Sequence, residues 1–176
     1  MHTLFFALRP PPDVAMRAVE FTERLRRDFG LRARATDAER LHVTLHFLGE
    51  EAAEPDLAER AARAAASVRS AAFDLRLDVL TSFRHSSARK PLVLTTHAVP
   101  QALQVFRLEL AVSLRMAGIG ADTKRFQPHL TLLRDARAVA EQSVAAFQWT
   151  VREFFLLRSL VGEGRHVVLG RWGLEG

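Results

Sequence analysis

The tetrapeptide His-x-Thr-Leu occurs twice in this chain, each time within apolar sequence that is typical of a β-strand. The copies are His42-Val43-Thr44-Leu45 and His129-Leu130-Thr131-Leu132. Successive side chains of a strand point to opposite faces, so each copy presents its imidazole and its hydroxyl together. The aliphatic residues between them anchor the other face. The repeat therefore predicts two half-buried strands that bring two histidines and two threonines to one place.

Apolar periodicity and turn residues divide the rest of the chain into further elements. We expect helices over 12–30, 55–70 and 100–118, and strands over 3–8, 41–48, 73–80, 92–99, 129–133 and 167–174, with a broken strand-rich segment over 147–161. Each half has a motif strand preceded by a helix, which indicates an approximate internal duplication. We expect one α+β domain over residues 1–176, built from two lobes.

The composition excludes several classes of protein. The chain has no cysteine, which rules out disulfides and thiolate metal sites. Three prolines at 10–12 cut the first apolar run short, and no basic residues precede it, so we expect a cytoplasmic protein without a membrane span. The net charge of +5 permits a phosphate-bearing partner, although most arginines are expected to be solvated helix residues.

The paired motifs suit acid–base chemistry on a phosphate. Imidazole titrates near neutral pH, so one histidine can accept a proton from water while the other donates one to a leaving oxygen. Threonine hydroxyls can donate hydrogen bonds to the non-bridging phosphoryl oxygens, where charge must be stabilised. This chemistry needs no metal, cofactor or nucleophilic side chain. The residues alone do not distinguish which imidazole is the acid.

Four residues near the motifs are further candidates. His46 shares the face of His42 by alternation and has either a substrate contact or a role at the strand end. Phe47 and Phe126 could stack on a base, although core packing is the commoner role of such phenylalanines. Simple alternation takes Arg134 off the His129 face and predicts a solvated charge, unless the strand twists or bulges at Asp135 and brings this guanidinium to the phosphate.

The other polar residues have simpler expected roles. The basic loop of Arg84, Arg89 and Lys90 is expected to be solvated, with phosphate attraction as the alternative. The remaining histidines are expected at the surface or in loops; they are His2, His85, His97 and His166.

The sequence resembles the 2H phosphoesterases, which are named for two His-x-Thr-x motifs. Within them it is most similar to the bacterial and archaeal RNA 2′,3′-cyclic phosphodiesterases, also called 2′-5′ RNA ligases. The resemblance covers nearly the whole chain and includes segments 4–8, 41–50, 126–134 and 151–162. It implies a bilobal, pseudo-symmetric fold with antiparallel sheets lining a central cleft and helices packed outside.

The resemblance also implies roles for individual residues. His42 would be the proton donor and His129 the proton acceptor, while Thr44, Thr131 and Arg134 would bind phosphate. For Arg134 this replaces the solvated role that alternation predicts. The implied reaction is metal-independent hydrolysis of RNA or nucleotide 2′,3′-cyclic phosphate ends to 2′-phosphomonoesters, by a monomer without a cofactor.

Two departures from the family pattern and several alternatives accompany this expectation. Ala35 stands where the family often has tryptophan, and Gln127 where it often has a basic residue, so both changes affect the flanks of the substrate. Reversible 2′-5′ RNA ligation and another cyclic nucleotide phosphodiesterase activity are alternatives on the same fold. A non-catalytic RNA-end-binding module and a zinc site on His42, His46 and His129 are alternatives of other classes.

Overall fold

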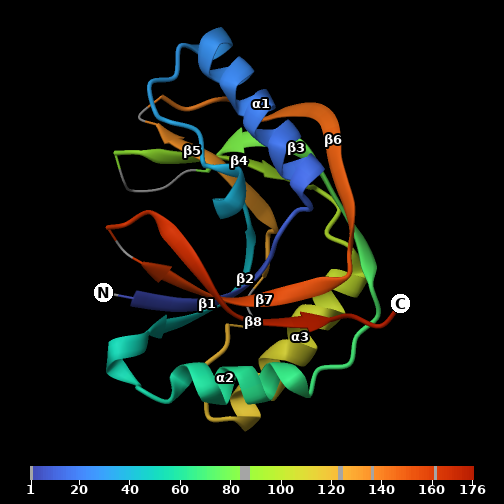
Figure 1. Cartoon of the computed structure of the whole chain (residues 1–176). Helices are drawn as coiled ribbons and strands as arrows, with labels where there is room; N and C mark the ends of the chain where they lie inside the picture. Colours follow the sequence, from blue (N-terminus) through green and yellow to red (C-terminus); the bar gives the residue numbers. More distant parts are fainter. Residues whose placement is uncertain (1, 84–87, 123–124, 136, 161) are drawn as a thin grey trace.

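Two four-stranded antiparallel sheets form the centre of the computed structural model (Figure 1). The structure describes residues 2–83, 88–122, 125–135, 137–160 and 162–176. The first sheet, called the β1 sheet here, has the order β2-β1-β7-β8. Its strands are β1 (His2–Leu8), β2 (Val43–Glu50), β7 (Glu153–Leu160) and β8 (Arg165–Gly173).

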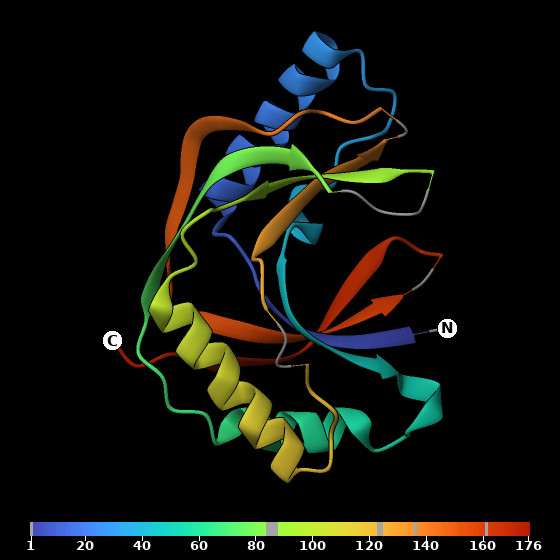
Figure 2. The same cartoon turned by 180° about the vertical axis from the view of Figure 1, so that it is seen from behind.

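The second sheet, called the β4 sheet here, has the order β5-β4-β3-β6. Its strands are β3 (Phe73–Ser82), β4 (Lys90–Thr95), β5 (His129–Asp135) and β6 (Gln142–Val151). The two motif strands, β2 and β5, occupy an edge of their respective sheets. They also contact each other, so the duplicated motifs meet where the two sheets meet (Figure 2).

Three helices cover the outer sides of the sheets, as Figures 1 and 2 show. Helix α1 (Pro12–Phe29) contacts β5 and β6 of the β4 sheet. Helix α2 (Leu57–Ala66) contacts β8, and α3 (Gln101–Met116) packs beside α2. Two short 3-10 helices, η1 (Ala38–Arg40) and η2 (Glu51–Ala53), flank β2. No helix in the described ranges is long and apolar enough to cross a bilayer.

Helix α1 illustrates how the sequence determines the element boundaries. Pro12 can occupy the first helical position because the amide there has no intrahelical partner. Gly30 ends the helix with a positive φ of 61°, a conformation that glycine adopts without steric cost. Val14, Ala18 and Leu25 are buried on one stripe of the helix, as their spacing predicts.

Strand β1 has hydrophobic side chains on both faces. Leu4, Phe6 and Leu8 belong to the large hydrophobic core, which includes residues of both sheets and of the helices. Phe5 and Ala7 form a small separate cluster with Phe155 and Leu157 of β7. This second cluster lies on the face of the β1 sheet that looks toward the β4 sheet, and we call that face of each sheet its inner face.

The α+β class and the order of elements are confirmed. The strand-rich segment 147–161 does break, at Arg152, and its first half begins earlier than expected, at Gln142. Lys90 is the first residue of β4 rather than part of a loop, while Arg84 lies outside the described residues. The first motif strand, expected over 41–48, continues to Glu50, with Gly49 inside β2 at a φ of 121°.

Candidate active site

The two motif histidines are held in the same way. His42 Nδ1 lies 2.7 Å from the carbonyl oxygen of Arg40, and His129 Nδ1 lies 2.9 Å from that of Gln127. A carbonyl oxygen can only accept, so Nδ1–H is the donor in each ring. In the neutral imidazole the proton is therefore on Nδ1 and the lone pair on Nε2. Each neutral ring thus has a fixed tautomer, and its Nε2 makes no hydrogen bond to a residue in the described ranges.

Equivalent β-bulges shape the two motif strands. On β5, Leu133 and Thr131 pair with the adjacent residues Leu92 and Val93, so Leu132 is an extra residue without a partner. On β2, His46 and Thr44 pair with adjacent residues of β1, which makes Leu45 the extra residue there. A bulge reverses the alternation of side chains beyond it. The side chains after each bulge therefore exchange faces.

The bulge at Leu132 decides the position of Arg134. On β4, His129 lies opposite Thr95, and Thr131 lies opposite Val93. Arg134 lies opposite Pro91. These three β4 partners are alternate residues of one strand and share a face, so the side chains paired with them share a face as well. Arg134 thus joins the inner face. Its charge lowers the pKa of His129, which is consistent with this proximity. Simple alternation was wrong here, and the bulge lies at Leu132, before Arg134, rather than at the expected Asp135.

The bulge at Leu45 has the opposite consequence for His46. This side chain is only 2% exposed, and its Nε2 is 2.9 Å from the backbone carbonyl of Arg107 on α3. The expectation that His46 shares the face of His42 and Thr44 is therefore wrong. Phe47 takes the inner face instead and is 60% exposed. It occupies the position in the first motif that Arg134 occupies in the second, five residues after the histidine.

The zinc alternative does not fit this arrangement. His46 turns toward α3 while His42 stays on the inner face, so the three imidazoles of His42, His46 and His129 do not converge. Elsewhere in the described ranges, no group of three histidine, cysteine or carboxylate side chains is placed to hold a metal ion.

Phe126, a candidate for base stacking, has Arg107 on one face of its ring. Its half-buried ring packs against the main core, and the Arg107 guanidinium lies 4.6 Å from the ring centroid. One face of the ring is therefore occupied by a cation, and base stacking on that face would displace Arg107.

His166 is a site residue that the sequence analysis missed. It was expected at the surface or in a loop, but it lies on β8, and its ring centroid is 4.9 Å from that of His42 in an edge-on arrangement. The Phe5 ring contacts both imidazoles, with its centroid 5.0 Å from that of His42 and 5.3 Å from that of His166. In Figure 1 the β7–β8 hairpin curls over the inner face of its sheet. The contact joins two residues that lie far apart in the sequence, so no local sequence signal could have shown it.

Burial and positive charge favour neutral imidazoles at the site. Burial is the largest cause that lowers the pKa of His42, and the charges of His129, Arg40 and Arg9 lower it further. Burial also lowers the pKa of His129, and it lowers that of His166 to about 4, with His42 contributing. Because His42 and His129 interact, a proton on one disfavours a proton on the other. The surrounding cations favour a bound anion.

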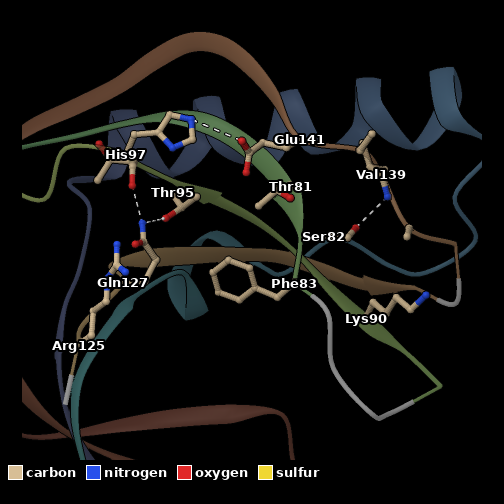
Figure 3. Close-up of a pocket in the computed structure, with 13 residues that line it drawn as sticks. Thr81, Ser82, Phe83, Lys90, Thr95, His97, Arg125, Gln127, Val139 and Glu141 are labelled. Carbon is tan, nitrogen blue, oxygen red and sulfur yellow. Dashed lines mark hydrogen bonds and ion pairs between the residues drawn. The ribbon is translucent and has the colours of Figure 1, made fainter.

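A cavity of about 1290 Å³ adjoins His129 on the inner face of the β4 sheet (Figure 3). Phe83 and Gln127, which line the cavity, also contact the His129 imidazole. The Phe83 ring lies edge-on to the imidazole at 4.9 Å, and the Gln127 carbonyl accepts the Nδ1–H bond. The Gln127 side-chain amide donates to the Thr95 hydroxyl and the Thr96 carbonyl, so this departure from the family pattern is part of the cavity wall.

The fold and the duplicated site define a known group, and the chain belongs to the 2′-5′ RNA ligase superfamily, whose family model matches residues 10–163. It is 31% identical to the RNA 2′,3′-cyclic phosphodiesterase of Escherichia coli (strain K12), with 97% of this chain and 96% of that protein covered. The resemblance found in the sequence is thereby confirmed.

Solved structures support the same assignment. The apo form of E. coli LigT has a TM-score of 0.77 at 29% identity, covering 99% of this chain and 98% of that one. LigT in complex with ATP has a TM-score of 0.80 at 27% identity, covering 99% of each chain. The TT0787 protein of Thermus thermophilus has a TM-score of 0.74 at 26% identity, covering 99% and 98%. The bilobal fold with antiparallel sheets and outer helices is therefore that of this family.

Proposed function

We propose that this chain hydrolyses RNA 2′,3′-cyclic phosphate ends to 2′-phosphomonoesters by acid–base catalysis with two histidines. The printed activity of the E. coli relative supports the reaction class. The observation that carries the mechanism is the matched pair of hydrogen bonds from Nδ1–H to the carbonyl two residues earlier. Both rings are thereby held in one tautomer, with Nε2 available for proton transfer.

The proposed reaction is a single in-line displacement at phosphorus. Nε2 of neutral His129 takes a proton from water as the water oxygen bonds to phosphorus. The bond from phosphorus to the ribose 3′ oxygen breaks, and Nε2–H of protonated His42 donates its proton to that oxygen. The product carries a 2′-phosphate and a free 3′-hydroxyl. Exchange of protons with solvent then restores both rings. The assignment of donor and acceptor follows the family resemblance.

Three further inner-face groups would hold the phosphate. The hydroxyls of Thr44 and Thr131 lie two residues after each histidine and would donate to the non-bridging oxygens, where negative charge accumulates. Arg134 would add a charge-assisted, forked contact. Each lobe would thus contribute one imidazole and one hydroxyl, while only the second motif contributes a cation.

Product analysis on an RNA oligonucleotide with a 2′,3′-cyclic phosphate end tests the proposal. With EDTA present we expect turnover and a product that carries only 2′-phosphate. Loss of turnover in EDTA that zinc restores would contradict the metal-independent mechanism. A 3′-phosphate product would reverse the assigned leaving oxygen. Binding of the oligonucleotide without turnover would favour the non-catalytic RNA-end-binding alternative.

Reversible 2′-5′ ligation is a second candidate, because the matching family carries that description. The same residues would serve if a 5′-hydroxyl of another strand replaced water as the nucleophile deprotonated by His129. Adding a 5′-hydroxyl oligonucleotide to the same assay separates the two activities. A joined product would support ligation, and its absence at high strand concentration would leave hydrolysis alone.

A further inference from the structure

The cavity beside His129 has features of a binding site in its own right. It extends over β3 and β4 from Phe83 and Gln127, which contact the His129 ring. Thr81 pairs with Val93, which also pairs with Thr131, so this hydroxyl lies on the same inner face as the second motif. The cavity is therefore continuous with the proposed catalytic site and leads away from it.

Two cations lie at opposite ends of this cavity, as Figure 3 shows for Lys90 and Arg125. Neither forms an ion pair with any residue that the structure describes. The lining carboxylate, Glu141, lies 3.6 Å from the ring of His97 and away from both cations. A positively charged cavity with separated cations suits a chain of phosphates better than a single neutral ligand.

The remaining lining groups suit the sugar and base of a nucleotide. The Thr81 hydroxyl makes no hydrogen bond to a described residue and can contact a ribose. Phe83 offers an aromatic surface on which a base can stack, whatever its identity. The volume of about 1290 Å³ is larger than the range of about 300–1000 Å³ that is typical of small-molecule sites.

We propose that this cavity binds RNA backbone beyond the reacting cyclic phosphate, with Lys90 and Arg125 contacting phosphodiesters and Phe83 contacting a base. This inference rests on the proposed function and names where the rest of the polynucleotide lies. The bound nucleotides belong either to the strand that carries the cyclic end or to a second strand that approaches His129. In both cases the cavity would bind the same groups, which are phosphodiesters and a base.

The test compares a nucleoside 2′,3′-cyclic phosphate with a trinucleotide that ends in the same group. We expect kcat/KM to be about tenfold higher for the trinucleotide in the wild type. In the Lys90→Ala/Arg125→Ala variant the ratio should fall toward one. The dependence of log KM on log salt for the trinucleotide should weaken by about 1.4, since each single-strand phosphate contact contributes about 0.7. The Arg24→Ala/Arg63→Ala variant removes the same charge from outer helices and should keep the wild-type ratio.

The remaining outcomes also decide the inference. If chain length has no effect, a 5′-hydroxyl trinucleotide is added as an inhibitor of cyclic mononucleotide hydrolysis. If the trinucleotide inhibits the wild type but not the Lys90→Ala/Arg125→Ala variant, the cavity binds a second strand. If it does not inhibit the wild type, the inference is overturned. If neither substrate is hydrolysed, the proposed function fails. Anisotropy of a labelled trinucleotide then tests the cavity alone, and equal binding by wild type and variant overturns it.

Discussion

At the scale of single residues, the two motifs differ in one functional position. The side chain five residues after the histidine is Arg134 in the second motif and Phe47 in the first, and both reach the inner face beyond a bulge. The charge of Arg134 lowers the pKa of His129, as the charges of Arg40 and Arg9 lower that of His42. The motifs therefore differ in the phosphate contact that each can offer, while the assignment of His129 as the base follows the family resemblance.

Replacing Arg134 with glutamine tests this asymmetry. The change removes a charge that lowers the pKa of His129, so the His129 pKa should rise, although burial, the larger cause, remains. Loss of the charge-assisted phosphate contact should raise KM roughly tenfold. NMR titration of the imidazole and steady-state kinetics measure the two effects. Arg137→Gln, three residues later, is the control. If neither the His129 pKa nor KM changes, the proposed contact of Arg134 with the phosphate and its proximity to His129 are contradicted.

At the scale of elements, Arg107 of α3 connects the two motif strands. Its Nε donates to the carbonyl of the bulged residue Leu45 at 3.1 Å, and its Nη2 donates to the carbonyl of Asp122 at 2.8 Å. The guanidinium also lies over Phe126, which leads into the second motif. One side chain thus holds the bulge of β2 and the segment before β5 in a fixed relation.

Arg107→Ala should therefore destabilise the fold by about 1–3 kcal/mol, because the Leu45 and Asp122 carbonyls lose their charged donor and Phe126 loses its cation contact. Arg107→Lys keeps the charge but not the fork, so its loss should be intermediate. Urea unfolding followed by circular dichroism measures the free energy of unfolding. Arg63→Ala on the exposed side of α2 provides the reference for a surface arginine and should cost less than about 0.5 kcal/mol. The connecting role is contradicted if Arg107→Ala costs no more than this reference.

The bulges also mark where prediction from the sequence ends. Periodicity and turn residues predicted the order of elements, and alternation placed each histidine with its threonine. Alternation failed beyond Leu45 and Leu132, since an extra residue in a strand is fixed by pairing with its neighbour and not by local sequence. His46 and Arg134 therefore took the faces opposite to those that simple alternation gives. His166 depended on the curl of a hairpin distant in sequence, which no local pattern encodes.

At the scale of the whole molecule, the imidazoles couple stability to pH. The pKa values of His42, His46, His129 and His166 are all lowered in the folded protein, with burial the largest cause in each case. In the unfolded chain these groups have the ordinary value of about 6.5. Below that pH the unfolded state binds more protons than the folded state, so acid favours unfolding.

The free energy of unfolding should therefore be greatest above pH 6.5 and fall as the pH decreases from 6.5 toward about 4, the folded-state pKa of His166. Urea unfolding at pH 7.5, 6.0 and 5.0 measures this dependence before most carboxylates titrate. The His166→Phe variant should lose part of the slope. Stability that stays constant or increases from pH 7.5 to 5.0 would contradict the burial of neutral imidazoles.

The central claim is that two equivalent imidazoles, one from each lobe, transfer the protons of the reaction. It is tested most directly by kcat/KM on a trinucleotide with a 2′,3′-cyclic phosphate end, measured for His42→Ala and His129→Ala with EDTA present. His2→Ala, at the exposed start of β1, is the control and should stay within about twofold of wild type. In each motif variant kcat/KM should fall at least about 100-fold, while the circular dichroism spectrum stays that of the wild type. A loss of less than about tenfold in either motif variant would contradict the paired mechanism.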